Sequence, residues 1–171
     1  PVVSTSIKIA GDDFDEALVR YMRKKHNLLI GERTAEEIKI AIGSVIPLEQ
    51  ELKMDVKGRD LVDGLPKVVS ICSEEVREAI EPIVTQIEET IRSTIERTPP
   101  ELVRDIVDQG IVLSGGTANL RGLNIRFADA LNVPIHIAEQ PVYSVALGLG
   151  KILEMPQDKN RLSITVEKQG V

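Results

Sequence analysis

The sequence predicts an α/β fold with parallel strands, and the last third of the chain shows the pattern most clearly. Residues 111–113 form a continuous apolar run, which is typical of a strand covered on both faces. A helix is expected over residues 119–131 and a second strand over residues 133–137. Pro141 opens a final helix that extends to Leu153. This order of strand, helix, strand and helix indicates a parallel pair joined by a crossover helix.

The beginning of the chain predicts a strand followed by a helix. Residues 1–10 alternate polar and apolar side chains, so we expect a strand that Gly11 ends. Asp12 or Asp13 is expected to cap the next helix, because a carboxylate accepts free backbone N–H groups there. The apolar face of this helix consists of Phe14, Ala17, Leu18, Tyr21 and Met22.

A second helix is predicted shortly after Gly31. Thr34 and Glu37 stand three residues apart, which is the spacing of a capping box. With Thr34 as the cap, the helix spans residues 35–42, and Gly43 closes it.

Residues 45–72 predict a small sheet or a pair of hairpins. Short runs rich in β-branched residues alternate there with turn signals. Lys57-Gly58 and Asp63-Gly64 are the two expected turns. We interpret this stretch as an insertion lobe.

Two further helices are predicted in the middle of the chain. A long one starts at Ser73, with apolar residues at steps of three, four or seven. Pro82 lies inside it, so a kink or a restart is expected there. Residues 98–101, Thr98-Pro99-Pro100-Glu101, form another capping box with proline at the first helical position, and the short helix that follows ends near Gly110.

The composition excludes several classes of function. The 171 residues carry a formal net charge of −6 and no tryptophan, whereas a nucleic-acid binder needs a basic face and stacking side chains. No nucleic-acid partner is therefore expected. The single cysteine, Cys72, indicates a cytoplasmic protein, and no apolar run approaches the roughly 20 residues of a membrane span. The two histidines, His26 and His136, have no metal-ligating neighbours in the sequence.

Two short motifs are candidate binding sites. Gly115 and Gly116 follow the strand at residues 111–113, where glycines let the backbone approach a ligand. A plain strand-to-helix turn is the alternative. Glu36 and Lys39 lie on adjacent faces of one helix and together suit a ribose or a purine edge. An ordinary solvated ion pair is the alternative.

A third feature is the basic stretch from Arg20 to His26. A solvated helix end and a contact with an acidic partner are both compatible with it. The chain contains no Gly-x-Ser-x-Gly elbow and no Walker loop.

Three segments read together resemble the MreB-like bacterial actins. They are residues 7–44, residues 97–123 and residues 135–154, and the match is collinear from about Val2 to Glu154. The resemblance implies an actin-like (ribonuclease H-like) fold with two lobes. Only the carboxyl-terminal lobe is matched, and the amino-terminal lobe is expected to be missing from this chain.

The resemblance also implies how the matched lobe is divided. Residues 1–30 and 80–154 would form the inner subdomain (IIA), and residues 31–79 the outer one (IIB). Residues 155–171 are expected to form a polar tail.

By the same resemblance, the helix that carries Glu36, Glu37 and Lys39 contacts the adenosine of ATP. A turn lies under the adenine and the α-phosphate, and its members are Gly115, Gly116, Thr117 and Ala118. Thr117 stands where the family usually has a third glycine, and a β-branched residue tolerates a positive φ poorly. Mg²⁺ accompanies the nucleotide in the full-length protein, in which the missing lobe supplies the metal-arranging carboxylates.

The implied function is that of an ATP-binding, filament-forming actin. Such a protein polymerises with itself in the cytoplasm and lies along the inner membrane, which it contacts through the missing lobe. It maintains rod cell shape by organising cell-wall synthesis with cell-shape and cell-wall elongation proteins. Because phosphoryl transfer needs metal, phosphate clamp and positioned water together, this chain alone is not expected to hydrolyse ATP. An isolated lobe also exposes apolar surface and is expected to aggregate.

Two alternatives stay open at this point. One is a non-catalytic truncated paralogue that caps filaments or binds cell-shape partners. The other is a different family of the same fold superfamily, such as the sugar kinases, the large heat-shock chaperones or the cell-division actins. The collinear match through residues 31–39 and 98–103 argues against the second alternative.

Overall fold

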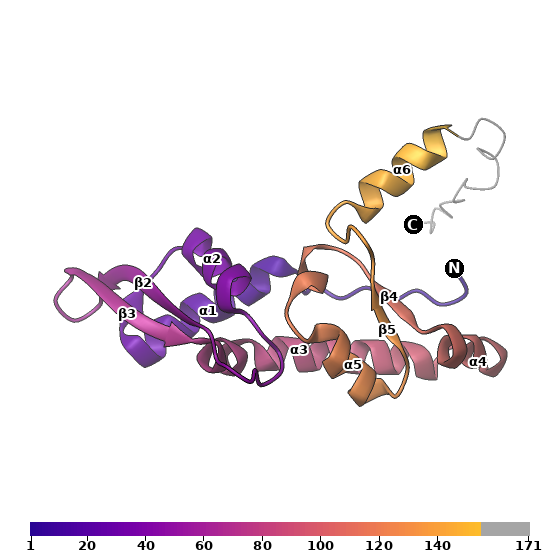
Figure 1. The fold of residues 1–171 in the computed structure, drawn as a ribbon, viewed down its shortest axis with the longest axis horizontal. Coiled ribbons are helices and arrows are strands. Elements are labelled where there is room, and N and C mark those ends of the chain that lie inside the picture. Colours follow the sequence, from indigo (N-terminus) through magenta and orange to yellow (C-terminus); the bar gives the residue numbers. More distant parts are fainter. Residues whose placement is uncertain (155–171) are drawn as a thin grey trace, which may run out of the picture.

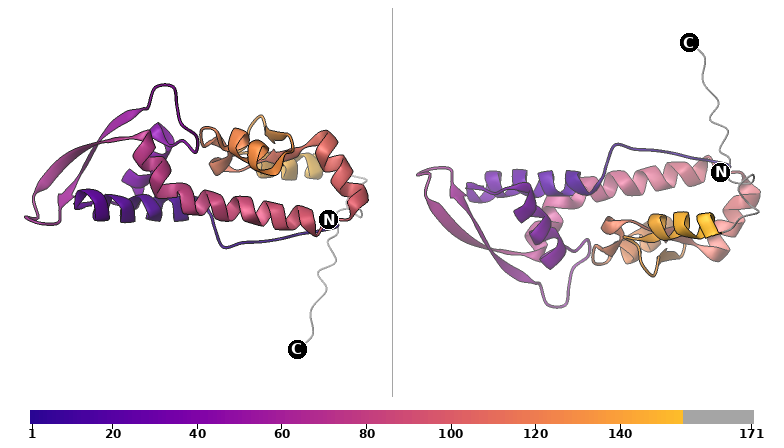
Figure 2. Two further views of the ribbon diagram at one scale, coloured as in Figure 1. Left: turned by 90° about the horizontal axis from the view of Figure 1, so that it is seen from below. Right: turned by 90° about the horizontal axis from the view of Figure 1, so that it is seen from above.

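The computed structural model describes residues 1–154, which form helices and two small sheets at opposite ends of the molecule (Figure 1). The long helix α3 runs along one side of the molecule and connects the end that holds the first sheet with the end that holds the second (Figure 2). The elements are, in chain order, α1 (Gly11–His26), β1 (Leu28–Leu29), α2 (Glu32–Ile42), β2 (Lys53–Asp60), β3 (Pro66–Cys72), α3 (Ser73–Glu96), α4 (Pro100–Gln109), β4 (Ile111–Leu113), the 3₁₀ helix η1 (Gly116–Asn119), α5 (Leu123–Leu131), β5 (Ile135–Ile137) and α6 (Ser144–Glu154).

Strands β4 and β5 form the predicted parallel pair. Ile111 pairs with Ile135 and Leu113 with Ile137, and α5 lies on the crossover between the two strands. The expectation that both faces of β4 are covered is wrong, because the Val112 side chain is 65% exposed. The reason is that no element of residues 1–154 covers the face on which Val112 lies, whereas Ile111 and Leu113 on the other face are partly buried.

Strands β1, β2 and β3 form an antiparallel sheet at the other end of the molecule. The turn predicted at Asp63-Gly64 is confirmed, and Gly64 has a φ of +76°. The turn predicted at Lys57-Gly58 is wrong, because both residues lie inside β2. A Cβ atom on Gly58 would stand 2.6 Å from the carbonyl oxygen of Leu29. Glycine here allows β1 to approach β2 closely, which a local turn pattern does not distinguish from a turn.

The strand predicted for residues 1–10 is absent, and the segment has no regular structure. It lies beside the end of α3, where the Thr5 Oγ1 atom accepts hydrogen bonds from Thr94 Oγ1 at 3.1 Å and from Arg97 Nη2 at 2.9 Å. Alternating side chains form a strand only when a neighbouring strand pairs with the backbone, and no strand of residues 11–154 does so.

Helix α1 begins at Gly11 and buries the predicted apolar face. Asp13 rather than Asp12 serves its amino-terminal end, because the Asp13 carboxylate accepts the backbone N–H of Ala10 at 2.6 Å. Of the expected face, Tyr21 is partly buried, and the fully buried members are Phe14, Ala17, Leu18 and Met22.

Helix α2 begins earlier than predicted. The backbone N–H of Ala35 donates to the carbonyl oxygen of Gly31 at 3.1 Å, which places Thr34 inside the first turn. The predicted capping box between Thr34 and Glu37 is therefore wrong. Glutamate and arginine, which precede Thr34, favour helix and extend it backwards. Gly43 follows the last helical residue, as predicted.

Helix α3 starts at Ser73 as predicted and continues through Pro82, so the helix does not restart there. Helix α4 begins with a proline, as predicted, but this residue is Pro100, one position later than a cap at Thr98 would place it. The expected capping box at Thr98 is wrong, because the residue that precedes α4 is Pro99, which has no side-chain acceptor for the free N–H groups of the first turn. Thr98 lies just after α3 instead, and its hydroxyl donates to the carbonyl oxygen of Thr94 at 2.8 Å.

The helix expected over residues 119–131 starts later than predicted, as α5 at Leu123, because η1 ends at Asn119 and a turn follows it. Gly122 has a φ of +79°, which lies outside the helical region, so the chain turns there before α5 starts at Leu123. The last helix also starts later than predicted, at Ser144 instead of Pro141. Within residues 1–154, no helix combines the length and the apolar character that crossing a membrane requires.

One continuous cluster of buried side chains extends from the antiparallel sheet to the parallel pair, and it includes Phe14 in α1 and Phe127 in α5. Arg126 reinforces this connection, because its guanidinium lies 2.7 Å and 2.9 Å from the two carboxylate oxygens of Glu81 in α3. Helix α1 packs against α2, β1 and α3. The division into inner and outer subdomains stays a prediction, and the predicted polar tail, residues 155–171, lies outside the described residues.

Candidate functional site

A cavity of about 640 Å³ lies between the start of α1, helix α2 and the turn that contains η1. It brings together the two motifs that the sequence separates, because Glu36 and Lys39 line one side and Gly116 and Thr117 another. The other lining residues are Gly11, Asp12, Asp15, Ile40, Gly43, Asn119, Leu120, Arg121 and Val142. The structure therefore places four of the seven candidate residues around a single hollow.

Lys39 lines the cavity, but its ammonium group is bound to α1. The Nζ atom donates to the carbonyl oxygen of Gly11 at 3.0 Å and to Asp15 Oδ2 at 2.9 Å, and it lies 2.7 Å from Asp15 Oδ1. The two side chains are only 16% and 11% exposed. Since each charge compensates the other in a largely desolvated place, neither group turns to a ligand without leaving its partner uncompensated.

The two neighbouring glutamates of α2 differ in position. Glu36 is exposed and lines the cavity, so its carboxylate can accept hydrogen bonds from a ligand. Glu37 does not line the cavity, and its Oε1 atom lies 3.3 Å from Arg33 Nε on the outer side of the helix. One residue of helix rotates the side chain by about 100°, which takes Glu37 away from the site.

The glycine turn has a backbone that depends on Gly115. This residue has a φ of +90° and a ψ of 167°, a combination that is essentially restricted to glycine. Its N–H donates to the carbonyl oxygen of Pro141 at 2.7 Å. Gly115 shapes the turn without lining the cavity, and Ala118 is buried beneath it with 3% exposure. Gly116 and Thr117 are the two members of the turn that face the hollow.

Thr117 fits the turn without backbone strain. Among residues 1–154, the only non-glycine residues with a positive φ are Asn27 and Asn132. The positive φ of the turn falls on Gly115, so a threonine two positions later is compatible with the geometry.

Sequence reasoning missed Asp15 and Arg121. Asp15 precedes Leu18 by three residues and Met22 by seven, so it lies on the apolar face of the helix. A carboxylate on such a face is expected to pair with a buried cation, and this signal could have identified Asp15. Arg121 Nη1 donates to the carbonyl oxygens of Ile40 and Gly43, at 3.2 Å and 3.1 Å, and so satisfies the end of α2. No local sequence pattern indicates this second role.

The charges around the cavity favour a ligand with hydrogen-bond donors. Asp12 and Glu36 are exposed carboxylates, whereas Lys39 and Arg121 use their donors on Asp15 and on backbone carbonyls. Free acceptors of this kind suit hydroxyl and amine groups, such as those of a nucleoside.

Comparisons with known proteins identify the family of the chain. The family model described as MreB/Mbl protein matches residues 1–161. The chain is 46% identical over 153 residues to the cell shape-determining protein Mbl of Bacillus cereus, covering 90% of this chain and 46% of that protein. It is 42% identical over 154 residues to the cell shape-determining protein MreB of Escherichia coli, covering 90% of this chain and 44% of that protein. The chain thus spans about half the length of these curated relatives.

Solved structures show the same fold. MreB5 of Spiroplasma citri bound to AMPPNP matches with a TM-score of 0.87 and 40% identity, covering 94% of this chain and 48% of that one. The same protein bound to ADP matches with a TM-score of 0.89 and 37% identity, with 94% and 49% coverage. The MamK double helical filament matches with a TM-score of 0.75 at 20% identity, over 88% and 46%, which supports the fold alone. These matches and the family model together show that the chain belongs to the MreB/Mbl family and has an actin-like fold.

Proposed function

We propose that this chain is part of an ATP-binding, filament-forming bacterial actin that maintains rod cell shape by organising cell-wall synthesis. The main support is the cavity in which Glu36 of α2 faces Gly116 and Thr117 of the glycine turn. MreB5 of Spiroplasma citri, a family member, has been solved with AMPPNP and with ADP.

Different residues of the cavity contact different parts of the nucleotide. The Glu36 carboxylate accepts hydrogen bonds from the ribose hydroxyls, and Lys39 holds the wall beside it through Asp15. The turn from Gly115 to Ala118 lies under the adenine and the α-phosphate. A Cβ atom on Gly116 would meet nothing within 4 Å, so the turn leaves open space for the ligand.

The phosphates and Mg²⁺ require residues beyond this chain. Lys39 and Arg121, the cations that line the cavity, are engaged with Asp15 and with backbone carbonyls. Among residues 1–154 there is no group of three or more His, Cys, Asp or Glu side chains suited to a metal ion. We therefore expect this chain alone to bind nucleotide weakly and not to hydrolyse it.

The wider role follows the family. Its relatives Mbl and MreB are cell shape-determining proteins. We propose that the full-length protein associates with itself into cytoplasmic filaments along the inner membrane, which it contacts through a part outside this chain. Its other partners would be the proteins of cell shape and cell-wall elongation.

Binding of a fluorescent ATP analogue to the full-length protein tests this proposal. Glu36→Ala removes one or two hydrogen bonds to the ligand, so we expect affinity to fall by about three- to tenfold. Glu37→Ala is the matched control, because this carboxylate lies on the same helix outside the cavity. Equal affinities for the two variants would contradict the site and favour a non-catalytic interaction module.

A further inference from the structure

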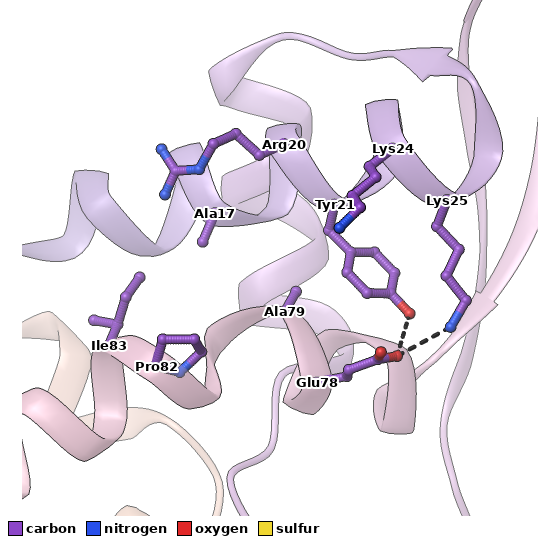
Figure 3. A pocket seen from close by; sticks show the side chains of 9 residues that line it. All are labelled: Ala17, Arg20, Tyr21, Lys24, Lys25, Glu78, Ala79, Pro82 and Ile83. Carbon is purple, nitrogen blue, oxygen red and sulfur yellow. Dashed lines mark hydrogen bonds and ion pairs between the residues drawn. The ribbon is translucent and has the colours of Figure 1, made fainter.

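A second hollow, separate from the nucleotide cavity, lies between helices α1 and α3 (Figure 3). We call it the α1–α3 groove, and its volume is about 460 Å³. Its apolar part is made of Ala17 from α1 and of Ala79, Pro82 and Ile83 from α3. Because two of these side chains are single methyl groups, the helices leave room between them for a side chain of another molecule.

The rim of the groove is basic. It carries three cations, Arg20, Lys24 and Lys25, and one carboxylate, Glu78. The chain as a whole has a net charge of −6. Arg20 lies 3.1 Å from Glu16, and Lys25 lies 3.0 Å from Glu78, whereas Lys24 forms no ion pair within residues 1–154. The groove is thus a positive area on an acidic protein, and such an area attracts an acidic partner.

One wall of the groove is ordered by hydrogen bonds. The Tyr21 hydroxyl donates to Glu78 Oε2 at 2.6 Å, and Lys25 Nζ donates to the same oxygen at 3.0 Å (Figure 3). A wall arranged before binding lowers the entropy cost of association. Pro82 has no N–H to donate to the carbonyl oxygen of Glu78, one helical turn earlier. This carbonyl oxygen lies in the same wall of the groove and lacks its usual helical donor.

We propose that the α1–α3 groove binds an acidic amphipathic helix of another protein. The helix inserts one apolar side chain between Ala17 and Ala79 and places its carboxylates against Arg20 and Lys24. This mode of binding uses a recessed apolar floor and a charged rim, which the groove provides. It does not depend on the proposed nucleotide site, since no residue lines both hollows.

An anionic membrane surface suits the groove less well. Membrane-bound helices insert large apolar side chains beside their cations. No large apolar side chain of α1 or of residues 78–83 is exposed, so this face has nothing to insert into lipid.

A synthetic helical peptide of about 15 residues tests the proposal on the full-length protein. The peptide carries one leucine flanked by glutamates on the same face, and its binding is followed by fluorescence anisotropy. We expect saturable binding that weakens as salt is added, because the rim charges are exposed. Peptides with glutamine for each glutamate, or with alanine for the leucine, are expected to bind at least about tenfold more weakly.

Protein variants locate the binding. Arg20→Glu with Lys24→Glu is expected to weaken the peptide about tenfold, whereas Arg33→Glu, an exposed cation on α2, is the matched control and should leave it unchanged. Ala79→Phe fills the groove while keeping every charge, and it is expected to abolish binding. Thermal melting of each variant separates a folding defect from lost binding.

Three results would overturn the proposal. The first is equal loss with Arg33→Glu and with the groove variants. The second is binding of phosphatidylglycerol vesicles, but not of the acidic peptide, through Arg20 and Lys24. The third is self-association of the protein that the double charge reversal removes, since a second copy would then be the occupant.

Discussion

Lys39 Nζ in α2 lies 2.7 Å from Asp15 Oδ1 in α1, and this contact joins two helices that border the proposed nucleotide cavity. Asp15→Asn leaves the Lys39 ammonium group without its counter-charge, although the Lys39 side chain is only 16% exposed. We expect the free energy of unfolding to fall by about 3 kcal/mol, measured by urea denaturation. Asp15→Leu combined with Lys39→Met removes both charges and should recover most of the loss. Additive losses in the double variant would show that the two charges do not interact.

Adjacent glycines of the turn are expected to respond differently to alanine. Gly115 has a φ of +90°, so Gly115→Ala should lower the free energy of unfolding by about 1–3 kcal/mol. Gly116 has no positive φ and open space around it, so Gly116→Ala should leave stability within about 0.5 kcal/mol while weakening binding of the ATP analogue. Urea denaturation and nucleotide titration of both variants check this. Equal stability losses at the two positions would be the contrary result.

Gly58 is expected to be the glycine on which the antiparallel sheet depends most. A Cβ atom there would stand 2.6 Å from the Leu29 carbonyl oxygen, so Gly58→Ala must displace β1 from β2. We expect a loss of about 1–3 kcal/mol in urea denaturation. Gly31→Ala is the control, because its added Cβ meets nothing within 4 Å. If Gly58→Ala were as mild as the control, β1 would not pair with β2 as described.

Glu51 gives the loop before β2 a pH-dependent attachment to α3. Hydrogen bonds from Arg77 and then from Ser73 lower the pKa of Glu51 from 4.5 to about 2. This contribution to stability is therefore complete above pH 4.5 and is lost as the pH falls towards 2. We expect Glu51→Gln to lower the melting temperature at pH 7, and the difference from the unaltered protein to close between pH 4.5 and 2. Glu49→Gln, an exposed residue of the same loop, should show no such pH dependence.

The open face of β4 and helix α6 is expected to make the isolated chain associate. Four large apolar side chains on these two elements are more than half exposed: Val112, Val145, Leu149 and Leu153. Exposed apolar surface next to an unpaired strand favours association. Val112→Lys with Leu149→Lys should shift the chain towards the monomer in light scattering. Val62→Lys, on the exposed hairpin tip, is the control and should not. A monomer at all concentrations without these changes would contradict the expectation.

Local patterns predicted the parts of the fold that depend on nearest neighbours in the chain. The apolar run at residues 111–113 and the alternation after it predicted β4 and β5 in parallel. The proline pair at residues 99–100 and Gly43 marked helix ends to within one residue, because proline and glycine act through their own backbone. Glu36 and Gly116 were recognised as candidates because their residue types alone allow contact with a ligand.

Tertiary structure decided what depends on partners distant in the sequence. Residues 1–10 alternate like a strand but have no strand to pair with, and Gly58 resembles a turn but allows close approach of β1. Asp15 became part of the site only because folding brings it to Lys39, 24 residues away. A sequence by itself determines which groups can cap, turn or accept a hydrogen bond. Which of those groups become paired, buried or free is set by the packing of α1, α2 and the glycine turn around one cavity.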